Sequence, residues 1–141
     1  MRFEAATPAD FERVAAAFAA GLRPGDAVAL SGEMGAGKTA FVRAAVRQLH
    51  GRDEATSPTF TFRHTYPGEP AIEHLDLYRL DDPREAAEIG LHEAFSPDAI
   101  TFVEWPERMP LLLPGNAHRV TIRGSGDARR QILIERPGDA G

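Results

Sequence analysis

The stretch Gly32-Glu33-Met34-Gly35-Ala36-Gly37-Lys38-Thr39 decides the fold that this sequence predicts. It matches the phosphate-binding pattern G-x-x-x-x-G-K-[ST] at every constrained position. A short apolar run, Ala27–Leu30, precedes it and favours a buried central strand, while apolar residues recur at helical spacing over about 38–50. A glycine-rich turn between a buried strand and a helix is the setting that a phosphate loop requires.

The residue types in this loop suit a polyphosphate. Glycines let the backbone pass close to an anion with its N–H groups pointing inward, and the helix N-terminus adds its positive end. Lys38 is the only lysine among sixteen basic residues, and we assign it to the β- and γ-phosphates. The hydroxyl of Thr39 can hold magnesium. We therefore predict that residues 32–39 bind a nucleotide with Mg²⁺.

Composition narrows the function further. With 16 basic and 21 acidic residues the net charge is −5, which argues against a broad basic surface for nucleic acid. The absence of cysteine excludes disulfides, thiolate metal sites and a cysteine nucleophile, and it suits a reducing cytoplasm. The longest apolar stretch, Val14–Leu22, is too short to span a bilayer. We expect one cytoplasmic domain over residues 1–141, with no membrane segment.

The rest of the chain predicts further helices and strands. Thr7-Pro8 marks the start of a helix that ends near residues 21–25. Strands are expected over 59–66 and 72–78 as an antiparallel pair, then a short helix over 82–89 closed by Gly90, and a buried strand over 100–103. Alternating apolar residues on either side of Gly124–Asp127 predict a C-terminal hairpin. The fold class is α/β: a P-loop NTPase-like three-layer fold whose mixed sheet has a parallel centre.

Two acids at strand ends are candidates to complete the site. Glu104 follows the strand over 100–103, at the sheet edge where P-loop folds deliver a carboxylate to magnesium. Asp76 follows Leu75, and His74 shares its face of the strand. A solvated edge charge is the alternative for each acid, and a structural or hydrogen-bonding role is the alternative for His74. Trp105 either packs at the core or rim or stacks near the nucleotide.

Few motifs in the sequence indicate which nucleotide base is bound or which reaction is catalysed. Asn116 is the only asparagine and no Asn-Lys-x-Asp segment exists, so guanine recognition by that route is excluded. Ser57-Pro58-Thr59-Phe60 stands where P-loop switches keep a threonine that senses the γ-phosphate, although a Ser-Pro turn alone is more often only a turn.

Four segments in this order resemble the bacterial TsaE (YjeE) family: the loop over 32–39, Ser57–Phe60, His74–Leu80 and Val103–Glu107. The one departure is Glu33-Met34, where that family usually has Asp-Leu. The resemblance implies an ATPase of tRNA threonylcarbamoyladenosine biosynthesis, which acts beside the TsaD and TsaB proteins and meets tRNA only indirectly.

The same resemblance implies roles for individual residues. Thr39 and Glu104 would bind magnesium, Lys38 and Asp76 would serve hydrolysis, and Trp105 would lie near the nucleotide. Arg79 is a weak candidate for an arginine finger, because the chain has many arginines, and a partner could supply that charge. Two alternatives stay open: a small-molecule P-loop kinase, and a nucleotide-binding scaffold that does not hydrolyse.

Overall fold

The computed structural model describes residues 1–52, 62–82, 84–85 and 90–138, which fold around a seven-stranded sheet of order β1-β7-β6-β2-β5-β4-β3. Parallel pairing joins four neighbouring strands at its centre: β4 (Ala71–Asp76), β5 (Ala99–Glu104), β2 (Ala27–Gly32) and β6 (His118–Arg123). Antiparallel pairing adds the outer strands β3 (Arg63–Tyr66), β7 (Arg130–Glu135) and β1 (Arg2–Ala5). The predicted mixed sheet with a parallel centre is confirmed.

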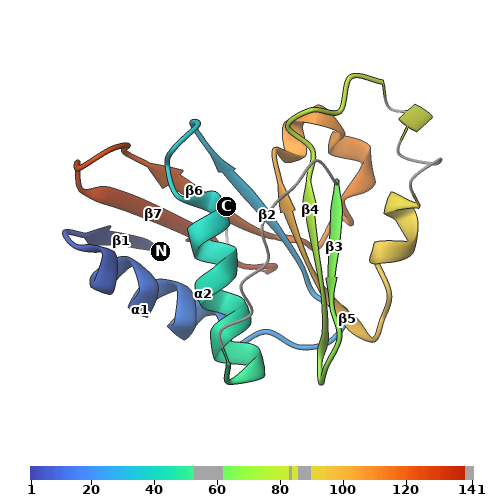
Figure 1. Ribbon diagram of the computed structural model, residues 1–141, viewed down its shortest axis with the longest axis horizontal. Coiled ribbons are helices and arrows are strands. Elements are labelled where there is room, and N and C mark those ends of the chain that lie inside the picture. The colour runs from blue at the N-terminus through green and yellow to red at the C-terminus, as the bar shows by residue number, and fades with distance from the viewer. Residues whose placement is uncertain (53–61, 83, 86–89, 139–141) are drawn as a thin grey trace.

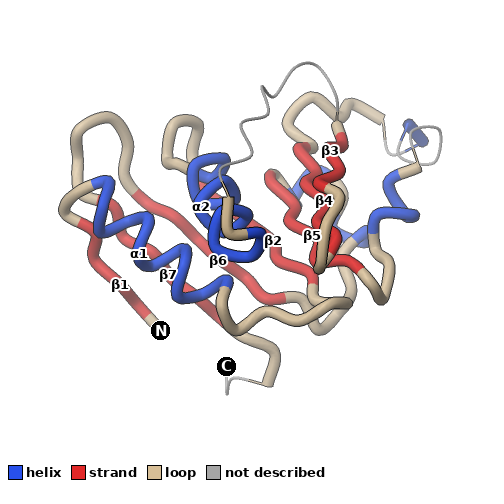
Figure 2. The backbone as a smooth tube through the Cα atoms, turned by 60° about the horizontal axis from the view of Figure 1, so that its bottom comes forward, coloured by secondary structure: helices blue, strands red, loops and turns tan. Residues whose placement is uncertain are grey.

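Two α-helices cover one face of this sheet (Figure 1, Figure 2). Helix α1 (Pro8–Ala19) begins as predicted, because the Thr7 side chain accepts a hydrogen bond from the Asp10 N–H. Helix α2 (Lys38–His50) follows Gly32–Gly37, the first residues of the predicted phosphate loop. Phe11 and Phe18 of α1 pack against Phe41 of α2, each at a ring-centroid distance of 5.9 Å. This contact fixes the two helices together over the central strands.

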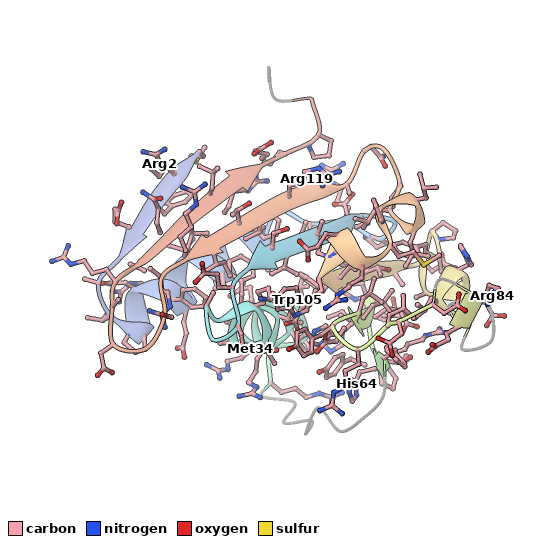
Figure 3. All side chains as sticks on the ribbon, turned by 90° about the horizontal axis from the view of Figure 1, so that it is seen from above. Arg2, Met34, His64, Arg84, Trp105 and Arg119 are labelled. Carbon is pink, nitrogen blue, oxygen red and sulfur yellow. The ribbon has the colours of Figure 1, made fainter. Side chains whose placement is uncertain are left out.

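A third layer covers the opposite face over β4 and β5. It contains the 3₁₀ turns η1 (Leu91–Ala94), η2 (Pro106–Arg108) and η3 (Pro110–Leu112). Leu75 of β4 and Val103 of β5 form a second apolar cluster with Leu77, Leu91 and Leu112 from this layer. Over β1, β7 and β6 the same face instead carries side chains such as Arg2 and Arg119 (Figure 3). The three-layer arrangement therefore surrounds the strands that end at the phosphate loop.

Several boundaries differ from the sequence predictions. Strand β1 was not predicted, because it has only four residues and pairs with β7 at the far end of the chain. Helix α1 ends at Ala19 rather than near residues 21–25, and β4 ends at Asp76 rather than continuing to Tyr78. The segment Ser57–Phe60 and most of the helix predicted over 82–89 lie outside the described residues. Within those described, no helix combines the length and apolarity needed to cross a membrane.

Candidate functional site

The loop between β2 and α2 has the backbone of an anion site. Gly35 and Gly37 adopt φ values of 80° and 109°, a region that favours glycine. Gly37 is also the N-cap of α2, and no side chain forms a capping hydrogen bond at this described position. The first N–H groups of α2 therefore keep their capacity for an external acceptor at the positive end of the helix.

Gly32 is constrained by space as well as by the turn. A Cβ atom at this position would lie 2.6 Å from the carbonyl oxygen of Ile122. We expect Gly32→Ala to lower the free energy of unfolding by about 1–3 kcal/mol, because the two strands must move apart. Urea denaturation would measure this, with Gly115→Ala as the control, since a Cβ there meets nothing within 4 Å. Equal stability of the two variants would contradict the close approach.

The Lys38 side chain extends from the start of α2 into the loop. Its ammonium donates to the carbonyls of Gly32 and Glu33, the latter at 3.1 Å, and lies 4.0 Å from the ring centroid of Trp105. The residue is buried, and burial lowers its pKa while the carboxylate of Glu104 acts in the other direction. The only lysine of the chain is thus held inside the loop that its position in the motif predicts.

The hydroxyl of Thr39, at the start of α2, meets the carboxylate of Glu104 at the end of β5. Thr39 Oγ1 lies 3.1 Å from Oε1 and 3.0 Å from Oε2 of Glu104. No group of three or more His, Cys, Asp or Glu side chains suited to a metal exists among the residues that the structure describes. One or two carboxylates plus phosphate oxygens are the usual ligands of Mg²⁺. The oxygen donors here therefore fit a magnesium ion that arrives with a nucleotide.

Asp76 lies beside Glu104, because the two are register partners at the ends of β4 and β5. Its carboxylate accepts a hydrogen bond of 3.1 Å from the Tyr78 N–H. Burial raises the pKa of Asp76 above its ordinary value, and the neighbouring charge of Glu104 acts in the same direction. The structure thus brings together Lys38, Thr39, Asp76 and Glu104, which the sequence had placed on three separate segments.

The raised pKa of Asp76 predicts a stability change. In the folded protein this carboxyl keeps its proton to a higher pH than in the unfolded chain, so stability falls as the pH rises through that interval. We expect Asp76→Asn to raise Tm near neutral pH, and the gain to vanish at about pH 3, where both states are protonated. Thermal unfolding at the two pH values would test this, with exposed Asp81→Asn as the control. A gain independent of pH would contradict it.

Trp105 follows Glu104 in an uncommon conformation. With φ 59° and ψ 50° it is the one non-glycine residue at positive φ among those described. Its ring lies 5.0 Å from that of Tyr78 and packs partly against the second apolar cluster. The Lys38 ammonium lies 4.0 Å from the ring centroid. The ring therefore borders the loop at the Lys38 ammonium and also packs at the rim of the core.

Arg130 and the cavity beside it were not predicted from the sequence. Arg130 Nε donates to the Ala36 carbonyl at 2.9 Å, and Nη2 donates to the Gly126 carbonyl at 2.9 Å. This side chain ties the β6–β7 hairpin to the phosphate loop and lines a cavity of about 270 Å³. Thr7, Gly37 and Asp127 also line it. The sequence of the hairpin turn does not predict this contact, because Arg130 and Ala36 are 94 residues apart in the chain.

Comparison with known proteins supports the resemblance. Residues 5–132 match the family model described as "Threonylcarbamoyl adenosine biosynthesis protein TsaE". A Rickettsia bellii protein named tRNA threonylcarbamoyladenosine biosynthesis protein TsaE is 41% identical over 122 residues, which cover 85% of this chain and 84% of that protein. A Bacillus subtilis protein of the same name is 31% identical, with 99% and 87% covered.

A solved structure agrees with these sequence matches. The crystal structure of Bacillus subtilis YdiB superposes with a TM-score of 0.80 at 29% identity, and the match covers 99% of this chain and 86% of that one. The shared fold extends over β1 and the C-terminal hairpin, which the sequence motifs did not reach. By family model, sequence and fold together, this chain belongs to the TsaE family.

Proposed function

We propose that this protein binds and hydrolyses ATP with Mg²⁺ as a component of tRNA threonylcarbamoyladenosine biosynthesis in the cytoplasm. The observation that carries the proposal is the meeting of three groups at the start of α2. The Lys38 ammonium lies in the loop, and the Thr39 hydroxyl contacts the Glu104 carboxylate at 3.0 Å. These are the groups that P-loop enzymes use for phosphates and metal.

The loop suggests how ATP would lie. We assign the phosphates to the N-terminus of α2, where Lys38 would leave the loop carbonyls for the anionic oxygens. The cavity beside Gly37 and Arg130 adjoins the other side of the loop, and its volume of about 270 Å³ suits a nucleoside. Its polar groups Thr7 and Asp127 offer hydrogen bonds to the sugar or base. Trp105 would then border the terminal phosphates.

Each residue of the site would have a separate role in ATP hydrolysis. Lys38 and the loop N–H groups stabilise negative charge on the phosphoryl group. Thr39 and Glu104 would hold magnesium, whose charge would help to neutralise the phosphate oxygens. Asp76 would orient the attacking water. Arg79 is a weak candidate for an arginine finger. We therefore propose that partners supply the missing positive charge and that the isolated chain hydrolyses ATP slowly.

We propose TsaD and TsaB as those partners, with tRNA contacted mainly by them. Measured phosphate release from ATP should occur slowly without any acceptor, and should rise when TsaD and TsaB are added. A reaction that instead requires a small acceptor, and yields its phosphorylated form, would show a P-loop kinase and contradict the proposal.

Trp105 offers an optical test of where ATP lies. Because it is the only tryptophan and its ring lies 4.0 Å from Lys38 Nζ, movement of that ammonium onto phosphates should change its fluorescence. We expect a saturable change on titration with ADP or ATP, and a smaller one with adenosine, which lacks the phosphates. A flat titration at saturating nucleotide would leave Trp105 a packing role only.

A further inference from the structure

A buried histidine contacts the carboxylate assigned to magnesium. His74 Nε2 on β4 lies 2.5 Å from Glu104 Oε2 on β5, and the exposed fractions of the two side chains are 6% and 4%. His74 and Asp76 on β4 and Glu104 on β5 lie at the ends of adjacent parallel strands. By the alternation along each strand they share the face of Ile72 and Phe102, which pack in one core cluster with α2. A polar contact this short between side chains this buried is a specific hydrogen bond rather than a chance approach.

Because of this contact, the two carboxylate oxygens of Glu104 have different hydrogen-bond partners. Oε2 lies 2.5 Å from His74 Nε2 and 3.0 Å from Thr39 Oγ1. Among the residues that the structure describes, Oε1 accepts a hydrogen bond from Thr39 alone, at 3.1 Å. A carboxylate oxygen engaged by a fixed donor is less available to a metal than its neighbour. The imidazole therefore distinguishes two oxygens that are chemically equivalent in a free carboxylate.

We propose that His74 is a positioning residue, which donates Nε2–H to Oε2 of Glu104 and so presents Oε1 to the metal. The inference rests on the proposed function, because it assigns a role within the same ATP and magnesium site. Glu104 has a flexible side chain, and the Asp76 carboxylate beside it in register would otherwise repel it. Groups that orient a metal ligand in this way commonly change metal affinity by about 10–100-fold when removed.

The competing interpretation is that His74 only fills space in the core. His118 provides a matched control, since it is also a buried histidine on a strand of the parallel centre. The exposed fraction of its side chain is 9%, against 6% for His74. It pairs with Val28 at the start of β2, whereas Glu104 pairs with Leu30 towards the loop. His118→Leu removes a buried imidazole without touching the phosphate loop.

The decisive quantity is the dissociation constant of the non-hydrolysable analogue AMPPNP, measured by calorimetry in EDTA and in Mg²⁺. Their ratio reports how much the metal strengthens nucleotide binding. We expect His74→Leu to reduce this ratio by about tenfold or more and to leave the EDTA value unchanged. His74→Gln should recover part of it, because its amide nitrogen can occupy the position of Nε2. His118→Leu should keep the wild-type ratio.

The outcomes separate the two proposals. If wild-type protein does not bind AMPPNP, or binds it without any effect of Mg²⁺, the proposed function fails. If wild-type protein shows the metal effect and His74→Leu keeps the same ratio, only the role of His74 is overturned.

A second measurement applies even if the leucine variant does not fold. In the metal-free wild-type protein, NMR should show an imidazole N–H proton at low field that exchanges slowly with solvent. This signal should disappear in Glu104→Ala, which removes the acceptor. A wild-type spectrum without a protected proton that depends on Glu104 would overturn the proposed hydrogen bond.

Discussion

Replacing Lys38 by alanine is expected to weaken ATP binding about 100-fold or more. The ammonium lies within the loop and would make charge-assisted hydrogen bonds to phosphate oxygens, which together contribute on the order of 3 kcal/mol. The fold should tolerate the change, because burial already disfavours the charged form of this side chain. Calorimetric titration with ATP and Mg²⁺ would give the two dissociation constants.

Arg43→Ala is the matched control for this loss. Arg43 is exposed on the same helix, α2, and carries the same charge outside the loop. It should bind ATP nearly as tightly as wild-type protein. If the lysine and arginine variants lose equal affinity, the attraction is a general effect of charge, and the assignment of the phosphates to the loop fails.

The second large effect concerns hydrolysis. We expect Asp76→Asn and Glu104→Gln each to reduce the rate of ATP hydrolysis by about 10²–10³-fold, because each removes a charge that acts on the reacting phosphate, its metal or the water. Asp76→Asn should keep its affinity for ATP, whereas Glu104→Gln should lose the strengthening of binding by Mg²⁺. Single-turnover rates at saturating ATP would separate chemistry from binding.

Asp98→Asn supplies the control, since Asp98 is exposed and precedes β5 at the end of the sheet opposite the loop. Its rate should match that of wild-type protein. Wild-type protein that binds ATP but shows no turnover for either site variant to remove, even with TsaD and TsaB present, would instead indicate a nucleotide-binding scaffold.

The central elements were predictable because each depends on local sequence. The motif over 32–39 defines its own turn, and the short apolar run before it favours a buried strand. The two-residue alternation along a strand predicts that His74 and Asp76 share one face, and this holds in β4 of the structure. The ends of β4 and β5 lie beside the loop. Local pattern therefore predicted the sheet centre, helix α2 and the neighbourhood of the candidate site.

The parts that escaped prediction depend on contacts between distant segments. Strand β1 acquires its pairing only from β7, and Arg130 reaches the phosphate loop from a hairpin that looked like a simple turn. The hydrogen bond between His74 and Glu104 likewise needs the parallel register of β4 and β5. Spacing along one chain can suggest which residues share a face, but it does not give the distance between atoms on neighbouring strands.

The most direct test of the whole account is calorimetric titration of folded wild-type protein with ATP and Mg²⁺. We predict a saturable heat with one nucleotide bound per chain, and a strong reduction of that heat when EDTA replaces the metal. Folded protein that gives no heat with millimolar ATP and Mg²⁺, and no change in Trp105 fluorescence, would contradict a nucleotide site in the Gly32–Thr39 loop.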